Sequence, residues 1–281
     1  MGHGGEGGRV LRQEFEIAAP GGRTVRGDMY AANGAKNGVV ICHGFKGFAR
    51  WGAWPVLAEA LNERGLNAVA FDFSGSGVGP DRVNFTDVEG FAANTYTREL
   101  EDLDAVVGHA TLHGWIAREF GLFGHSRGGA TAIFFAANSE RVSALVTWAS
   151  IATIERWSED QIRDWRERGS TEVVNTRTGQ VMRIDKSAWE ECERESRAGL
   201  NVESAAARVR APWLIVHGSA DDVVPVRDAH RLARANGGAE VQVIDGANHI
   251  LGASHPLTSV PPQLRQTIAG TADFFSAELS A

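Results

Sequence analysis

The stretch GLFGHSRGGATAIFF, residues 121–135, decides the fold more than any other part of the chain. A short apolar run, typical of a buried strand, ends at Gly124, and an apolar segment of helical length begins at Gly128. Ser126 lies between them in a G-x-S-x-G pattern. A turn this tight has no room for side chains beside the serine, and it holds the hydroxyl exposed at the end of the strand. We therefore predict that Ser126 is a catalytic nucleophile.

Apolar runs of strand length alternate with amphipathic helical segments along most of the chain. Except for the first two runs, the strand candidates are continuously apolar, which indicates burial on both faces of a parallel sheet. The pattern predicts an α/β fold with a mostly parallel, doubly wound sheet of about eight strands. The expected strands are residues 13–18, 24–31, 38–42, 68–73, 120–123, 144–148, 213–216 and 241–244, and the expected helices are 54–64, 96–110, 128–138, 226–235 and 263–279.

A long insertion interrupts this alternation between Trp148 and Trp213. It contains two charged helical segments, 158–168 and 186–197, and a hairpin with its turn at 175–179. Because a long structureless loop is rare inside a compact domain, we expect an ordered subdomain here. The sequence thus predicts a cap subdomain at 150–203, inserted into a core domain of residues 1–149 and 204–281.

Composition and charge argue against several classes of protein. The net charge of −7 and the pI of 5.7 do not suit a nucleic-acid-binding surface. The sequence has no apolar run of the ~20 residues that a membrane span needs. The glycine-rich start, expected to be a flexible tip, has no apolar segment typical of a secretory signal. With only two cysteines, and Cys42 in a buried strand, we expect a cytoplasmic protein; its oligomeric state is left open, a homodimer included.

A serine nucleophile needs a neighbouring base, and four histidines follow Ser126. His217 ends an apolar strand and is expected to be structural, and His230 lies within a helix, where a surface position is expected. His249 lies in a loop after a strand, at the sheet edge where Ser126 also emerges. His255, six residues further on, is a weaker candidate. We predict His249 as the base.

Three motifs together resemble the α/β-hydrolase superfamily over nearly the whole chain: the G-x-S-x-G stretch, HGSADDVVP at 217–225 and GANH at 246–249. The HGF motif at 43–45 and the place of the insertion are similar to bacterial carboxylesterases of the cinnamoyl/feruloyl esterase kind. They are also similar to the hydrolase domains of dipeptidyl and acylaminoacyl peptidases. Dehalogenases and epoxide hydrolases of this fold carry aspartate at the nucleophile position, so a serine there implies acyl transfer to water.

The resemblance also implies which residues complete the site. The family's acid loop resembles H-G-x-x-D-x-x-V-P, which makes Asp221 the acid and Asp222 a bystander; Asp245 is a distant third candidate. The backbone N–H groups of Phe45 and Arg127 are the implied oxyanion hole. The expected triad is therefore Ser126, His249 and Asp221.

Two further patterns are expected to be structural. The glycines at 75–79 fail the dinucleotide fingerprint and resemble a turn of the α/β-hydrolase fold, so we expect no cofactor. His109 and His113 have a metal-binding spacing but no third ligand, so we expect a surface pair and no metal site.

Tryptophans are concentrated near the insertion and after the HGF motif. Trp51, Trp157, Trp165 and Trp189 are candidates for the substrate pocket, with packing inside the cap as the alternative. Such walls would suit small aromatic or short- to medium-chain acyl esters.

The sequence thus predicts a serine carboxylesterase that acts on a small-molecule ester through an acyl-enzyme. Two other functions stay open: a serine peptidase of the acylaminoacyl or dipeptidyl type, and a non-enzymatic ligand receptor on a hydrolase fold.

Overall fold

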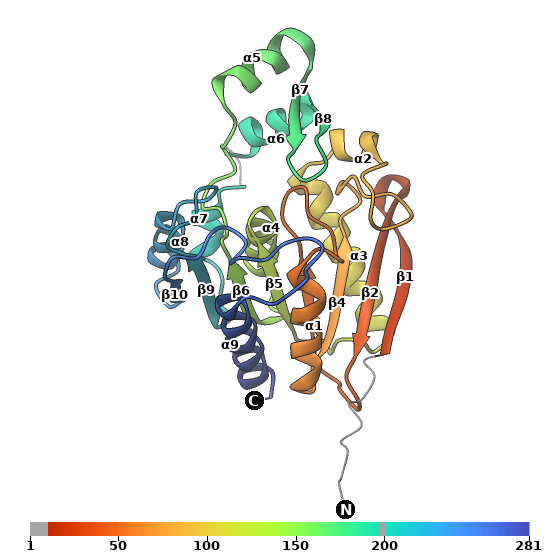
Figure 1. Cartoon of the computed structure of the whole chain (residues 1–281), viewed down its shortest axis with the longest axis vertical. Coiled ribbons are helices and arrows are strands. Elements are labelled where there is room, and N and C mark those ends of the chain that lie inside the picture. Colours follow the sequence, from red (N-terminus) through yellow and green to blue (C-terminus); the bar gives the residue numbers. More distant parts are fainter. Residues whose placement is uncertain (1–10, 197–199, 281) are drawn as a thin grey trace, which may run out of the picture.

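The computed structural model describes residues 11–196 and 200–280, so the glycine-rich tip and Arg197 of the second charged helix lie outside the described residues. Within the described part, eight strands form a central sheet in the order β1-β2-β4-β3-β5-β6-β9-β10 (Figure 1). β1 pairs antiparallel with β2, β2 pairs antiparallel with β4, and the other pairs are parallel. The predicted α/β-hydrolase-like sheet is confirmed. The strands are β1 (Leu11–Ala19), β2 (Arg23–Ala31), β3 (Gly38–Cys42), β4 (Asn67–Asp72), β5 (Phe120–His125), β6 (Val142–Trp148), β9 (Trp213–Gly218) and β10 (Glu240–Ile244); a 3₁₀ turn, η1 (Pro20–Gly22), joins the first two.

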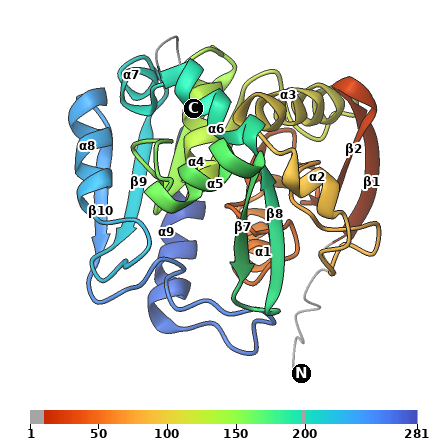
Figure 2. The ribbon, with the colours of Figure 1, turned by 90° about the horizontal axis from the view of Figure 1, so that it is seen from above.

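Helices cover both faces of this sheet (Figure 2). One face packs against α1 (Ala53–Glu63) and α9 (Pro262–Leu279). The other packs against α3 (Tyr96–Leu112), α4 (Arg127–Ala136), α7 (Val202–Ala206) and α8 (Arg227–Asn236). Successive side chains of β3 alternate between the two layers: Val39 and Ile41 join the α1–α9 core, and Val40 and Cys42 join the other. This alternation explains why the central strands are continuously apolar.

Three details differ from the sequence expectation. α2 (Val88–Ala92) and α7 were not expected, because five residues are too few to show an amphipathic period. Each begins with a side-chain cap, from Asp87 and Asn201 respectively. β10 is not buried on both faces: it is an edge strand whose Val243 is 42% exposed.

The insertion forms a small layer above the carboxyl ends of the strands (Figure 1). It consists of α5 (Glu159–Arg168), β7 (Ser170–Asn175), β8 (Gln180–Asp185) and α6 (Lys186–Ser196). Its core residues Trp165, Met182 and Trp189 share an apolar cluster with Phe48 of the loop after β3 and Phe91 of α2. Residues 151, 152 and 154 pack into the main core instead. The layer formed by these four elements is called the α5–α6 segment below.

A buried carboxylate ties the α5–α6 segment to the main body. Glu191 of α6 is 2% exposed, and it accepts hydrogen bonds from the backbone N–H groups of Tyr96 (2.6 Å) and Thr97 (2.9 Å). These are the first two residues of α3, where N–H groups lack acceptors within the helix and the helix dipole favours negative charge. The contact fixes α6 over the start of α3.

Both cysteines, Cys42 and Cys192, are buried and free. Within the described residues, none of the helices combines the length and the apolar character that a membrane crossing requires.

The turn from β5 to α4 is tight and closely packed. Ser126 has φ 54° and ψ −118°, a conformation that non-glycine residues rarely adopt. A Cβ on Gly124 would collide with the backbone of Gly128, and a Cβ on Gly128 would collide with the carbonyl oxygens of Cys42 and His43. The glycines are thus required by close backbone approach, as the sequence pattern indicated.

This requirement predicts opposite effects for two glycine-to-alanine changes. Gly128→Ala is expected to destabilise the protein by about 1–3 kcal/mol or more, because the added methyl overlaps backbone that cannot move freely. Gly108→Ala, at an open and exposed position in the middle of α3, is expected to stabilise by about 0.5–1 kcal/mol. Urea unfolding of both variants measures the difference. Equal effects at the two positions would contradict the steric account.

Candidate active site

Three side chains from three separate loops form one hydrogen-bonded chain. Ser126 lies after β5, Asp221 after β9 and His249 after β10. The Ser126 hydroxyl donates to Nε2 of His249 at 3.1 Å, and Nδ1–H of His249 donates to Oδ2 of Asp221 at 2.8 Å. The structure thus brings together the three residues selected from the sequence. A neutral imidazole held this way can accept the proton of the serine.

Asp221 is held as a buried carboxylate, whereas Asp222 is exposed. Oδ1 of Asp221 accepts the N–H groups of Val223 (2.9 Å) and Val224 (2.8 Å). Burial alone would raise the pKa of Asp221, but the hydrogen bonds from His217, His249 and the Val224 N–H together lower this pKa below its usual value. Asp221 therefore stays ionised beside His249.

The other candidate residues of this region have different surroundings. Nε2–H of His217, which is fully buried, donates to the Val224 carbonyl at 2.8 Å and lies 3.3 Å from Oδ2 of Asp221. It is therefore a structural support of the acid loop. Asp245 accepts the Ser219 hydroxyl at 3.2 Å at the turn after β10, and His230 is exposed on α8.

Backbone contacts hold the Asp221 and His249 loops together. The N–H of Ser219 donates to Ile244 O (2.9 Å), and the N–H of Ala220 donates to Ala247 O (3.0 Å). Gly218 lies so close to Ala247 that a Cβ there would collide with its carbonyl. Because β9 and β10 are parallel neighbours, their carboxyl ends place the acid and the base side by side.

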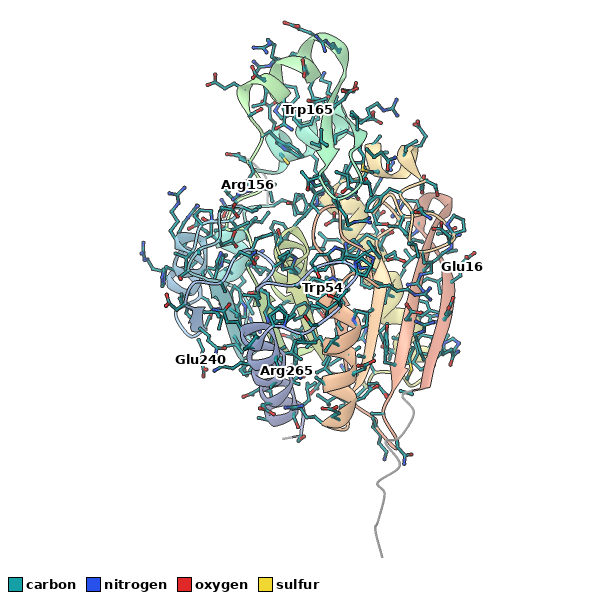
Figure 3. The ribbon with its side chains drawn as sticks, viewed as in Figure 1. Glu16, Trp54, Arg156, Trp165, Glu240 and Arg265 are labelled. Carbon is teal, nitrogen blue, oxygen red and sulfur yellow. The ribbon has the colours of Figure 1, made fainter. Side chains whose placement is uncertain are left out.

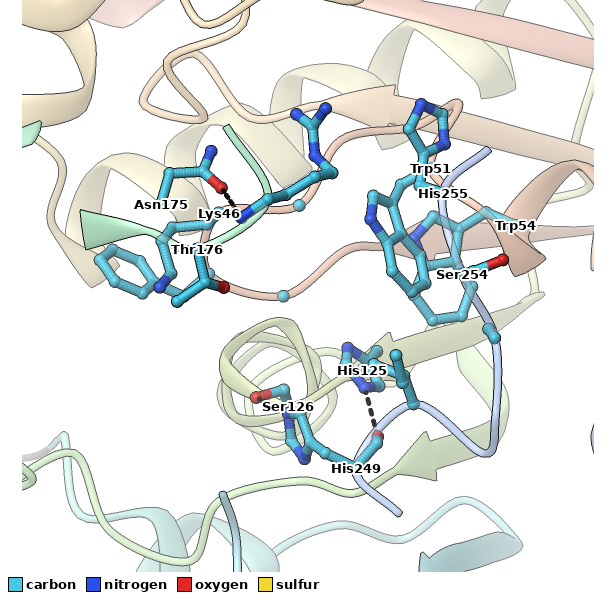
Figure 4. Close-up of a pocket in the computed structure, with 16 residues that line it drawn as sticks. Lys46, Trp51, Trp54, His125, Ser126, Asn175, Thr176, His249, Ser254 and His255 are labelled. Carbon is cyan, nitrogen blue, oxygen red and sulfur yellow. Dashed lines mark hydrogen bonds between the residues drawn. The ribbon is translucent and has the colours of Figure 1, made fainter. Parts of the chain in front are cut away.

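His125, inside the G-x-S-x-G motif, has a supporting role that sequence reasoning missed. Its Nε2–H donates to the carbonyl oxygen of His249 at 3.1 Å, as Figure 4 shows. The ring is buried, and Nδ1 has no hydrogen-bond partner among the described residues. Burial and the neighbouring His249 lower the pKa of His125 to about 3, so the ring is neutral. A histidine beside the serine in the motif was the signal that could have indicated this contact.

The loop after β3 runs directly over Ser126. A Cβ on Gly44 would lie 3.1 Å from Cβ of Ser126. His43 fixes this loop, because its Nδ1–H donates to Gly44 O (2.8 Å) and its Nε2 accepts the N–H of Phe73 (3.2 Å). Burial lowers the pKa of His43, which favours the neutral ring that this pair of bonds requires.

Two backbone N–H groups are free to bind an oxyanion near Ser126. The N–H of Phe45 makes no hydrogen bond within the described part of the chain. The N–H of Arg127 lies at the first position of α4, where it has no acceptor within the helix. Both expected oxyanion donors thus have unused hydrogen-bonding capacity.

The side chain of Arg127 has a separate, structural role. Its guanidinium pairs with buried Glu99 of α3 at 2.6 Å and lies 3.8 Å over the ring of Tyr96. Glu99 also accepts hydrogen bonds from Thr131 (2.6 Å) and Asn94 (2.7 Å). This network, which the sequence did not reveal, fixes the start of α4 and with it the N–H of Arg127.

A cavity of about 410 Å³ opens onto Ser126 and His249 (Figure 4). Of the four tryptophans expected in the pocket, Trp51 lines it, together with Trp54, which the sequence analysis did not select. Trp157, Trp165 and Trp189 do not line it. Trp165 packs against both Trp157, which lies just before α5, and Trp189 of α6. Trp165, labelled in Figure 3, is fully buried, and its indole N–H donates to Ile184 O at 2.9 Å. Internal packing, the alternative weighed for these residues, therefore accounts for the three.

The glycine-rich turn and the other histidine candidates make contacts that support the fold. Asp72, at the start of the glycine-rich turn, accepts the N–H of Ala49 (2.6 Å) and pairs with Arg82 (2.9 Å). His255 accepts the N–H of Gly52 at 3.1 Å in the cavity wall. The rings of His109 and His113 lie 4.0 Å apart. In the residues that the structure describes, no group of three or more His, Cys, Asp or Glu side chains could hold a metal ion.

Comparisons with known proteins agree with the fold. A model described as "Alpha/beta hydrolase family" matches residues 39–260. Est1E from Butyrivibrio proteoclasticus, solved with ferulic acid bound, is similar with a TM-score of 0.75 and 18% identity, over 95% of this chain and 100% of that one. The esterase domain of a Rhodothermus marinus protein has a TM-score of 0.66 and 19% identity, over 95% and 99% of the two chains. The α/β hydrolase GrgF from Penicillium has a TM-score of 0.73 and 17% identity, over 97% and 100%. No curated protein sequence matches the chain.

The buried neutral state of His125 predicts a pH dependence of stability. Below about pH 6 the unfolded chain binds a proton at this histidine and the folded chain does not, so acidification favours unfolding. The free energy of unfolding is expected to fall more steeply between pH 5.5 and 4.5 in the wild type than in His125→Gln. The difference in slope is about 1.4 kcal/mol per pH unit.

Urea unfolding at several pH values measures this slope. Ile133→Val, a buried change on α4 without a titratable group, is the control: it lowers the stability at each pH and leaves the slope unchanged. Identical slopes for His125→Gln and the wild type would show that His125 is not the buried neutral group.

Proposed function

Because the chain belongs to the α/β-hydrolase family, we propose that it is a serine carboxylesterase that works through an acyl-enzyme. The observation that supports this most directly is the hydrogen-bonded chain from Ser126 through His249 to Asp221. It ends beside two available N–H donors and opens into a cavity.

In the proposed reaction, the Ser126 oxygen attacks the ester carbonyl while Nε2 of His249 accepts its proton. The developing oxyanion accepts hydrogen bonds from the N–H groups of Phe45 and Arg127, and each such donor contributes about 3 kcal/mol in comparable sites. His249 then protonates the departing alcohol. Water, activated by the same imidazole, hydrolyses the acyl-enzyme and regenerates the serine.

Asp221 has two parts in this scheme. It holds Nδ1 of His249 in the protonated tautomer, so that Nε2 faces Ser126, and its charge stabilises the imidazolium formed in the transition state. The bonds to Asp221 from the Val223 and Val224 N–H groups keep the carboxylate in position. The reaction as proposed needs no cofactor.

The cavity suggests a small ester. Its volume suits a compact acyl or aryl group, and Trp51, Trp54 and Phe45 offer apolar surface. We propose small aromatic or short- to medium-chain acyl esters as substrates. The ferulic acid bound to Est1E, a neighbour in fold, is consistent with an aromatic acyl group.

The α5–α6 segment is proposed to act as a cap. Asn175, Thr176 and Arg177, at the tip of its hairpin, line the cavity. The segment therefore forms part of the wall that the substrate contacts. We also propose a cytoplasmic location, with which two free, buried cysteines are consistent.

Ser126→Ala is expected to abolish turnover of 4-nitrophenyl esters, with a loss of at least about 10³-fold in kcat, because the oxygen that forms the proposed acyl-enzyme is removed. Wild-type protein should also be labelled at Ser126 by a fluorophosphonate. Wild-type turnover in the variant would refute the role of Ser126 as the nucleophile. Equal hydrolysis of an ester and its matching aminoacyl anilide would instead support a peptidase. If the wild type showed neither fluorophosphonate labelling nor turnover, a ligand receptor would be supported.

Two adjacent aspartates provide a matched test of the acid. Asp221→Asn is expected to lower kcat by about 10³–10⁴-fold, because the imidazole loses the partner that sets its tautomer. Asp222→Asn, at the exposed neighbouring position, is expected to change kcat less than about threefold. Steady-state kinetics of both variants shows which aspartate is the acid. A larger loss of kcat in Asp222→Asn would identify Asp222 instead.

A further inference from the structure

Two positively charged side chains lie in the wall of the cavity, and the proposed ester chemistry does not use them. Lys46 follows Phe45 in the loop after β3, and Arg177 lies in the β7–β8 turn. The two charges therefore come from different parts of the fold. In Figure 4, Lys46 lies with the β7–β8 turn residues on one side of the space, with Ser126 and His249 on the other.

These cations have no acidic partners among the described residues. Of the described residues that line the cavity, none is Asp or Glu. Within the described part of the chain, neither Lys46 nor Arg177 forms an ion pair, although the protein carries a net charge of −7. A locally positive cavity in an acidic protein is a site that attracts anions.

Lys46 combines a strained backbone with a single side-chain hydrogen bond. Its backbone has φ 58°, a left-handed conformation that is strained for a non-glycine residue. Nζ donates one hydrogen bond, to Val174 O at 3.1 Å, which leaves two N–H groups for a ligand. The ammonium is half-buried, and burial lowers the pKa of Lys46. An anion bound beside it would offset this loss of solvation.

Among the described residues, the Arg177 guanidinium has no hydrogen-bond partner. The guanidinium lies 5.7 Å from the centre of the Phe48 ring and 5.5 Å from that of Phe85, so aromatic rings support it. The turn is fixed by the backbone, because the N–H of Arg177 donates to Oδ1 of Asn175 at 3.2 Å. The guanidinium keeps its planar set of N–H groups, which matches the two oxygens of a carboxylate.

We propose that the ester substrate carries a carboxylate, which Lys46 and Arg177 bind while Ser126 attacks the ester carbonyl. This inference rests on the proposed function, because it names the substrate class of the same site. The apolar surface of Trp51 and Phe45 then contacts the part of the substrate between the carboxylate and the ester. Lys46 and Arg177 are specificity residues in this scheme.

Matched pairs of esters test the proposal. On the acyl side, mono-4-nitrophenyl adipate is compared with 4-nitrophenyl hexanoate, which has the same number of acyl carbons and no carboxylate. On the alcohol side, 4-(carboxymethyl)phenyl hexanoate is compared with 4-ethylphenyl hexanoate. The wild type is expected to prefer the charged ester in at least one pair, by about tenfold or more in kcat/KM, the size expected for charge-assisted hydrogen bonds. Added salt should reduce this preference.

The variants Lys46→Met and Arg177→Gln are each expected to lower that preference by roughly tenfold, and Arg177→Glu to reverse it. A variant that only disturbs the loop after β3 is expected to lower kcat/KM for both esters of a pair and to leave their ratio unchanged. Lys36→Met, at an exposed position between β2 and β3, is the control and should retain the wild-type ratio.

The outcomes separate the two proposals. Good turnover of the neutral esters without a preference in either pair would overturn the carboxylate site and leave the esterase proposal intact. A preference that survives in Lys46→Met and Arg177→Gln would also overturn it. No turnover of any ester would contradict the proposed function itself.

Discussion

The structure depends on one backbone constraint, the turn at Ser126 where β5 passes into α4. This turn requires a left-handed φ at the serine and the absence of side chains at Gly124 and Gly128. Because Gly128 lies directly against the carbonyl oxygens at the end of β3, the start of α4 and the loop after β3 are packed together without an intervening side chain. The positions of the hydroxyl, the helix N-terminus and the Phe45 N–H are therefore coupled.

Charge is distributed unevenly around this turn. His43 and His125 are buried and favour the neutral form, because each has a backbone partner that a neutral ring satisfies and burial opposes a proton. Asp221 is buried but charged, because several N–H groups donate to it. His249 lies between these environments, with its Nδ1–H donating to the Asp221 carboxylate.

The α5–α6 segment adds the part of the site that a bare core would lack. Glu191 fixes it to the start of α3, and its tryptophans pack in an apolar cluster that the segment shares with Phe48 and Phe91. Its hairpin turn then brings Arg177 to the cavity wall that also contains Lys46. The core and the inserted segment thus both contribute residues to the wall of one cavity.

The sequence by itself determined the sheet, the tight turn and the order of the three site residues. These depend on local requirements: continuous apolar strands, glycines where backbones touch, and a serine, an aspartate and a histidine at strand ends. Only the tertiary structure decided which tryptophans face the cavity, that Glu99 holds Arg127, that His125 supports the His249 loop, and that Lys46 and Arg177 share one wall. Each of those contacts joins residues far apart in the chain, and their spacing carries no periodic signal, so the side chains find their partners only after the layers have packed.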